Sequence, residues 1–239
     1  MNKKQFILNE VKKIDIELSE EQVEQFLKYY ELLVEWNSFM NLTGITEFEE
    51  VVIKHFVDSL SLVKGIDLKQ DLSLIDIGTG AGFPGLPLKI AFPNLKVTLL
   101  DSLNKRIKFL DEVIYQLGLT DIDTIHGRAE DFAKPDKLRE KYDICVSRAV
   151  ANLSTLSEYC LPFVKLDGCF VSYKSEKLSE ELENAKKAIF VLGGKFDNQI
   201  DFSLADGDIY RNLVFIKKVQ KTPKQYPRKA GTASKSPIC

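Results

Sequence analysis

The chain has 239 residues, of which 44% are hydrophobic and 28% charged, and its formal net charge is −2. This length allows one domain or one domain with a small extension, and the composition is typical of globular proteins. No apolar run approaches the ~18 residues of a membrane span, the first residues lack the apolar core of a signal peptide, and the four cysteines show no C-x-x-C spacing. We therefore expect a cytoplasmic protein that does not bind a membrane or a metal ion.

Residues 1–68 are expected to form a helical N-terminal cap. Ser19 and Gln22 fit the pattern of a helix capping box, and apolar residues follow them at helical spacing. Thr46 and Glu49 repeat the capping pattern ahead of a second apolar run. Between these helices, residues 36–44 are rich in Asn and Gly, which predicts a loop.

After residue 68 the hydrophobic pattern changes to alternating strands and helices. Short apolar runs predict strands at 72–77, 96–100, 122–126, 142–147 and 168–173. Helical patterns lie between and after them, at 86–92, 104–117, 153–164 and 179–192. Two further strands, 195–202 and 210–219, are separated by a short turn. The alternation predicts an α/β fold with a parallel sheet covered on both faces, followed by a terminal hairpin.

The first predicted strand leads into a turn with four glycines, in the run Leu74-Ile75-Asp76-Ile77-Gly78-Thr79-Gly80-Ala81-Gly82-Phe83-Pro84-Gly85. Glycine lets the backbone approach a ligand closely, and proline suits the start of a helix. A glycine-rich turn at the carboxyl end of a parallel strand is typical of a site for a nucleotide-like cofactor.

Two cofactors fit this turn. Gly80, Gly82 and Gly85 satisfy the dinucleotide pattern G-x-G-x-x-G, whereas Asp76 with the first three glycines gives D-x-G-x-G-x-G, which resembles motif I of class I S-adenosylmethionine (SAM) methyltransferases. Asp101 directly follows the second predicted strand, 23 residues after Gly78. Its carboxylate can accept hydrogen bonds from a ribose, which NAD and SAM both carry, or cap the next helix. The terminal hairpin favours SAM, because it resembles the seven-stranded methyltransferase sheet, whose last strand is antiparallel.

The ends of the third and fourth predicted strands complete the expected pocket. They carry Gly127-Arg128-Ala129-Glu130 and Ser147-Arg148-Ala149. In methyltransferase-like sheets the first position borders the adenine, and the second faces the methionine and the substrate.

The absence of several motifs narrows the range of atoms that could accept the methyl group. Ser147-Arg148-Ala149-Val150 stands where an amine methyltransferase has Asn/Asp-Pro-Pro-aromatic, and Cys145 lies within a strand rather than where a nucleophile of a pyrimidine C5 methyltransferase is found. An acceptor that needs little activation remains, and guanine N7 fits, because its lone pair already lies in the ring plane and needs no general base. Arg148 and Lys174 are the candidate catalytic residues, positioning the base through its O6 or a phosphate. His55 and His126 are assigned no catalytic role.

The last part of the chain is basic. Seven Lys and Arg residues and no acid lie from residue 217 onward, leaving 26 basic and 35 acidic residues in the rest. We expect residues 221–239 to form a tail that holds RNA, although charge alone fits a solubilising tail equally well. The candidate RNA-binding residues are Asn37, Asn41, Lys221, Lys224, Arg228 and Lys229. Trp36 and Tyr226 are candidates for stacking on a base, whereas core packing is the preferred interpretation for Phe39.

Together these motifs, with His55-Phe56-Val57-Asp58-Ser59-Leu60 and Tyr226-Pro227-Arg228-Lys229-Ala230-Gly231-Thr232, resemble the glucose-inhibited division protein B family, the bacterial 16S rRNA guanine-N7 methyltransferases. The resemblance implies SAM as cofactor, with contacts at Gly78, Phe83, Ala129, Glu130 and Arg148. It also implies 16S rRNA of the small ribosomal subunit as partner, with a guanine in the helix 18 loop as acceptor.

The expected organisation is therefore a cap over 1–68, a SAM-binding domain over 69–220 and a basic tail over 221–239, in a monomer. The full set of expected cofactor-binding residues is Asp76, Gly78, Gly80, Gly82, Phe83, Asp101, Ala129, Glu130 and Arg148. Two other functions stay open on the sequence. One is an NAD(P)-dependent oxidoreductase that uses the second glycine pattern and Asp101, and the other is a non-catalytic RNA- or ribosome-binding module.

Overall fold

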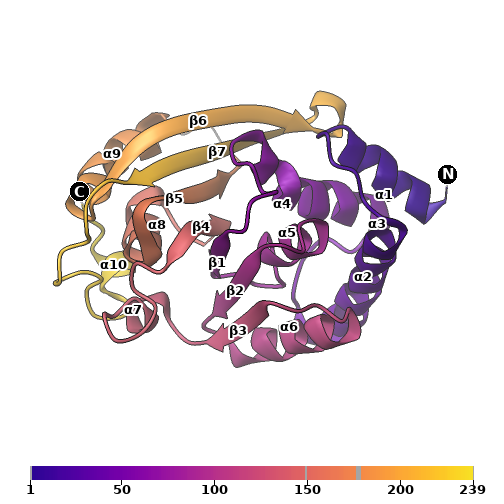
Figure 1. Cartoon of the computed structure of the whole chain (residues 1–239), viewed down its shortest axis with the longest axis horizontal. Helices are drawn as coiled ribbons and strands as arrows, with labels where there is room; N and C mark the ends of the chain where they lie inside the picture. The colour runs from indigo at the N-terminus through magenta and orange to yellow at the C-terminus, as the bar shows by residue number, and fades with distance from the viewer. Residues whose placement is uncertain (1, 149, 176–178, 239) are drawn as a thin grey trace.

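The computed structural model describes residues 2–148, 150–175 and 179–238, so Ala149 of the second strand-end motif and Cys239 lie outside the described residues. A sheet crosses the molecule, with helices on both of its faces (Figure 1). The strands are β1 (Ser73–Ile77), β2 (Lys96–Asp101), β3 (Ile122–His126), β4 (Tyr142–Arg148), β5 (Val164–Lys174), β6 (Gly194–Leu204) and β7 (Ile209–Lys218).

The strand order is β3-β2-β1-β4-β5-β7-β6. All neighbours from β3 to β5 pair in parallel, and β7 pairs antiparallel with both β5 and β6. This confirms the predicted seven-stranded sheet with an antiparallel last strand. The order reverses between β1 and β4, and in open α/β sheets ligands bind beyond the carboxyl ends of the strands at such a point.

The helices form two layers. The N-terminal part contains α1 (Lys3–Lys12), α2 (Glu20–Met40), α3 (Phe48–Val51), the π-helix η1 (Val52–Val57), α4 (Asp58–Leu60) and the 3-10 helix η2 (Ser61–Lys64). These pack on the same face as α5 (Gly85–Ala91) and α6 (Asn104–Gln116). The other face carries α7 (Ala129–Phe132), α8 (Leu153–Cys160), η3 (Leu161–Phe163) and α9 (Ser179–Val191). The 3-10 helix η4 (Ala205–Gly207) forms the turn between β6 and β7, and α10 (Thr232–Lys235) lies near the C-terminus.

Alternation along the strands explains the two layers. Leu74 of β1 belongs to the core on the N-terminal side, whereas its neighbour Ile75 belongs to the core under α8 and α9. Successive side chains of a strand point to opposite faces, so a strand buried on both sides is largely apolar, and in β1 the polar residues are Ser73 and Asp76.

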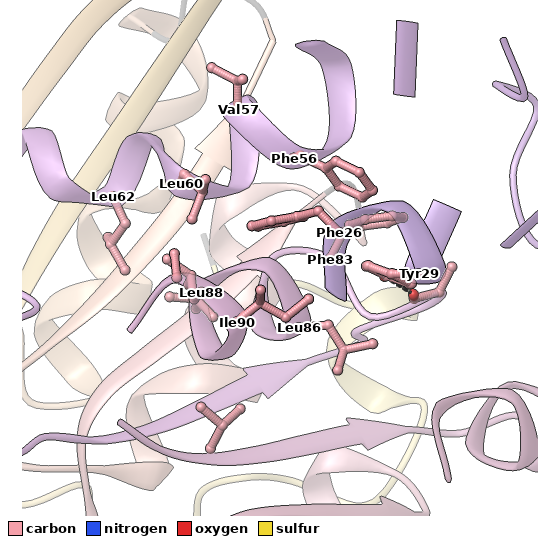
Figure 2. Close-up of a cluster of buried hydrophobic side chains, with 14 of the residues drawn as sticks. Phe26, Tyr29, Phe56, Val57, Leu60, Leu62, Phe83, Leu86, Leu88 and Ile90 are labelled. Atoms are coloured by element: carbon pink, nitrogen blue, oxygen red, sulfur yellow. Dashed lines mark hydrogen bonds between the residues drawn. The ribbon is translucent and has the colours of Figure 1, made fainter. Parts of the chain in front are cut away.

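The N-terminal helices share one core with the sheet domain. Phe26 and Tyr29 of α2 and Phe56 of η1 gather against Phe83 and the apolar face of α5, as Figure 2 shows. The Tyr29 hydroxyl donates to the carbonyl of Ala81 within the glycine turn. The cap therefore supports the turn directly. None of the helices in residues 2–148, 150–175 and 179–238 is long and apolar enough to cross a membrane.

Two local predictions in this region were wrong. The predicted loop over 36–44 is helical as far as Met40, because Trp36 packs on Phe109 of α6, with ring centroids 5.7 Å apart. The capping box predicted at Thr46 and Glu49 does not form, since α3 begins after Glu47 without a side-chain cap. The first capping box is confirmed, with Ser19 and Gln22 bonded to each other's backbone N–H groups.

Candidate active site

The glycine turn after β1 has a backbone that requires glycine. Gly80 and Gly82 have φ angles of 63° and 100°. A Cβ at Gly80 would meet no atom closer than 4.0 Å, whereas a Cβ at Gly82 would lie 2.4 Å from a Leu86 methyl carbon. Gly80 thus borders open space, and Gly82 allows the turn to pack on α5.

Asp76 stabilises the glycine turn from its buried side, away from solvent. Its side chain is fully buried, and its Oδ2 accepts hydrogen bonds from Thr79 Oγ1 at 2.7 Å and from Gly85 N at 2.9 Å. Burial raises the pKa of this carboxyl to about 7, against the opposing effect of the two hydrogen bonds. Asp76 therefore shapes the turn and does not line the adjoining cavity.

Asp101 joins the turn to the next helix. Its Oδ2 accepts from Gly80 N at 2.9 Å and its Oδ1 from Leu103 N at 2.9 Å, at the residue before α6. Arg106 donates to the same Oδ2 at 3.1 Å. The Arg106 side chain is one-third exposed, so this guanidinium lies on the solvent side of the buried Asp101 carboxylate.

A cavity of about 380 Å³ opens over these residues. Its lining includes Gly78, Gly80, Phe83, Asp101, Arg148 and Val150. Five of the expected cofactor-binding residues are therefore brought together. The open glycine backbone, the carboxylate and the apolar sides of Phe83 and Val150 fit the adenosine and methionine parts of SAM.

The other expected cofactor residues lie outside this lining. Asp76 and Gly82 are behind the turn, and Ala129 and Glu130 begin α7, both largely buried. Glu130 Oε1 accepts a hydrogen bond from Gly231 N at 2.8 Å, so the C-terminal segment reaches this part of the domain.

A second cavity, of about 440 Å³, shares His55 and Arg148 with the first. Lys54, Asp58, Tyr173 and Arg211 line it as well, together with Lys174 and Glu181. Lys174 and Arg148 both line this cavity. Its Nζ already donates to Glu181 Oε1 at 2.6 Å and to the carbonyl of Ala151 at 3.1 Å.

Arg148 stands at the wall between the two cavities. Its Nη1 donates to Asp58 Oδ2 at 2.7 Å, and its Cζ lies 5.0 Å from the centre of the Phe83 ring. The His55 ring stacks on the Phe83 ring with centroids 4.4 Å apart, and its Nδ1 lies 3.4 Å from Arg148 Nη2. Burial, followed by the charge of Arg148, lowers the pKa of His55 to about 3. The imidazole is therefore neutral at neutral pH.

The sequence analysis did not assign roles to Asp58 or Arg211. Asp58 belongs to a motif that was noted, His55-Phe56-Val57-Asp58-Ser59-Leu60, and it follows directly on the π-helix η1, a distortion that is frequent at functional sites. Arg211 lies in β7 and had no signal in the sequence. Only the fold places it beside a residue 153 positions earlier.

The expected basic tail is packed against the domain and is not a free extension. Arg228 forms an ion pair with Glu158 of α8, and the Glu158 side chain is only 1% exposed. Arg139 donates to the carbonyls of Tyr226 and Pro223. Arg228 is thus engaged within the protein, whereas Lys221, Lys224 and Lys229 are exposed.

The remaining RNA-binding candidates lie at the end of α2. Asn37 lies within the last turn of this helix and holds the chain that follows it, because its Oδ1 accepts from the N–H groups of Leu42 and Thr43. Asn41 is the C-cap residue. Phe39 was expected in the core, but 66% of it is exposed. Trp36 is partly buried against Phe109.

The strand order and the glycine-lined cavity define a class I methyltransferase fold. The solved TYW2 of P. horikoshii in complex with MeSAdo has this fold, with a TM-score of 0.53 at 18% identity over 68% of this chain and 61% of that one. TYW2 of M. jannaschii in complex with AdoMet gives 0.52 at 17% identity, over 63% and 71%.

The family follows from sequence comparison. The model of the GidB family, described as rRNA small subunit methyltransferase G, matches residues 22–210. "Ribosomal RNA small subunit methyltransferase G" of Lachnoclostridium phytofermentans is 56% identical over 95% of this chain and 94% of its own length. The protein of the same name from Alkaliphilus metalliredigens is 51% identical over the full length of both. The chain belongs to the GidB family of SAM-dependent methyltransferases, which decides against the oxidoreductase alternative.

Proposed function

We propose that this protein transfers a methyl group from SAM to N7 of a guanine in small-subunit rRNA, within the helix 18 loop. The observation that carries the proposal is the shared wall of His55 and Arg148 between the two cavities. A methyl donor in the first, glycine-lined cavity and a methyl acceptor in the second cavity would meet at this wall. In this proposal residues 1–68 act as the cap, 69–220 as the SAM domain and 221–239 as a docked basic segment.

The side chains fit an acceptor that loses no proton. SAM supplies an electrophilic methyl group on a sulfonium when it is bound. Guanine N7 attacks through a lone pair and carries no hydrogen, so no base is required, and the neutral His55 is consistent with this. Arg148 offers donors for the guanine O6 and leaves N7 free. Gly78, Phe83 and Asp101 would hold the cofactor from the lining of the first cavity, and Ala129 and Glu130 from outside this lining, at the start of α7.

The direct test is transfer of labelled methyl groups from SAM to small ribosomal subunits taken from a strain that lacks this protein, with the modified nucleotide mapped. We expect one labelled guanine, methylated at N7. Free 16S rRNA and assembly intermediates, assayed in parallel, identify the substrate form. We further propose that the enzyme acts in the cytoplasm as a monomer.

Calorimetry with SAM and with NADH tests the cofactor separately, and we expect binding of SAM alone. RNA binding without any methyl transfer would instead favour the other function left open by the sequence, a non-catalytic RNA- or ribosome-binding module.

A further inference from the structure

Asp58 lies between two guanidinium groups in the second cavity. Its Oδ1 accepts from Arg211 Nε at 2.8 Å, and its Oδ2 accepts from Arg148 Nη1 at 2.7 Å. The Asp58 side chain is 3% exposed, and those of Arg211 and Arg148 are 18% and 15% exposed. One carboxylate therefore balances two largely buried cations.

The other groups around this cavity do not supply the missing negative charge. Lys54 pairs with Glu50, and Lys174 pairs with Glu181, one cation with one carboxylate in each case. The lowered pKa of His55 keeps it neutral, and burial raises the pKa of the Tyr173 phenol well above its usual range. Within the described residues, the cavity wall and its ion-pair partners thus carry one positive charge in excess.

The excess charge faces the second cavity through Arg211. Its Nε donates to Asp58 and its Nη1 to the carbonyl of Tyr210 at 2.9 Å, while Nη2 has no hydrogen-bond partner among the described residues. Arg148 lines both cavities, but Arg211 lines only the second. A buried cation without a counter-charge is costly, and a guanidinium with free N–H groups is well suited to bind phosphate.

We propose that Arg211, held in place by Asp58, binds a backbone phosphate of the RNA strand that carries the acceptor guanine. The inference rests on the proposed function, because a nucleotide acceptor brings a phosphodiester with it whereas the guanine base is neutral. The methionine carboxylate of the methyl donor is another anion, but it belongs to the cavity that Arg211 does not line. Arg148 at the shared wall is left to contact the base.

The test compares the Arg211→Gln variant with wild type in two binding assays. RNA binding is measured with small ribosomal subunits that lack the methyl group, between 50 and 200 mM salt, and SAM binding is measured by calorimetry. We expect about tenfold weaker RNA binding and a salt dependence reduced by about one phosphate contact, with unchanged SAM affinity. Lys96→Gln is the matched control, since Lys96 is exposed at the opposite, amino-terminal end of β2.

Arg211→Lys keeps the charge and provides a second readout if the Gln variant does not fold. It should retain the salt dependence of wild type and lose only part of the affinity. Equal RNA affinity and salt dependence for Arg211→Gln and wild type would overturn the proposal, as would a loss of SAM affinity equal to the loss of RNA affinity. For the Lys variant, a reduced salt dependence would overturn it. Failure of wild type to methylate the subunits would count against the proposed function instead, because neither binding assay requires turnover.

Discussion

Arg228 and Glu158, which are 70 residues apart in the chain, are joined by side-chain and backbone hydrogen bonds. Arg228 Nη2 lies 2.6 Å from Glu158 Oε2, and Arg228 N lies 2.8 Å from Oε1. Thr155 of the same helix donates to the carbonyl of Ala233 at 3.2 Å. These contacts attach the C-terminal segment to α8 and place Gly231 against Glu130.

Replacing Arg228 by Gln should destabilise the protein by about 3 kcal/mol, because it leaves the Glu158 carboxylate buried without its partner. Urea unfolding measures the loss. Lys229→Gln, at the exposed neighbouring position, is the control and should change stability by less than about 0.5 kcal/mol. Equal stability of the two variants would contradict the structural role of the pair.

The RNA-binding role of the C-terminal segment is best tested without deleting it. Truncation at Thr222 would remove the contact to Glu130 together with the positive charges, so loss of SAM binding and loss of RNA binding would be mixed. The triple variant with Lys221, Lys224 and Lys229 changed to Gln keeps the packed residues.

We expect the triple variant to bind small subunits more weakly and with a smaller salt dependence, while SAM affinity stays the same. Filter binding at several salt concentrations and calorimetry measure the two quantities. An unchanged salt dependence would show that these lysines face away from RNA.

Two glycine substitutions separate ligand binding from folding. In Gly80→Ala the new methyl group enters open space at the cavity, whereas in Gly82→Ala it meets Leu86 and the Tyr29 hydroxyl. Both carry the strain of a positive φ, about 1 kcal/mol or more. Gly82→Ala should therefore lose more stability than Gly80→Ala, and Gly80→Ala should lose SAM affinity while it remains folded. Thermal unfolding and calorimetry provide the comparison, and the reverse order would exclude this assignment.

Asp76→Asn should change how stability depends on pH. The pKa of Asp76 is about 7 in the folded protein and about 3.8 when unfolded, so the folded state binds its proton more tightly. The stabilisation is fully present below pH 3.8 and is lost as the pH rises through 7. The variant lacks this contribution.

The difference in unfolding free energy, wild type minus Asp76→Asn, should thus fall by about 1.4 kcal/mol per pH unit between pH 4.5 and 6.5. Taking the difference cancels the other groups, including His55, whose lowered pKa acts in the opposite direction over pH 3 to 6.5. Urea unfolding at several pH values gives both curves, and a constant difference would refute the raised pKa.

Arg148 and Lys174 should differ in their effect on methyl transfer. Arg148→Lys removes the planar donor group at the wall between the cavities, and we expect a loss of at least about 100-fold in the rate of a single turnover. Lys174 is already held by Glu181, so Lys174→Gln should cost less than about tenfold. Equal losses would place the two residues in the same role.

The sequence by itself determined the order of strands and helices and the glycine turn with Asp76 and Asp101. These features depend on local periodicity and on backbone angles that only glycine adopts readily, so neighbouring residues carry the information. The resemblance of the sequence motifs to a known family then identified SAM as the expected cofactor.

Only the tertiary structure decided which charged side chains are paired within the protein and which remain available to bind a ligand. Helix α2 extends to Met40 within the predicted loop because Trp36 packs on Phe109, and Arg228 is engaged within the protein because it pairs with the buried Glu158. Asp58 and Arg211 become neighbours only when β7 inserts between β5 and β6. Pairing between residues far apart in the chain leaves no periodic signal, yet the free energy of a buried charge depends on that pairing.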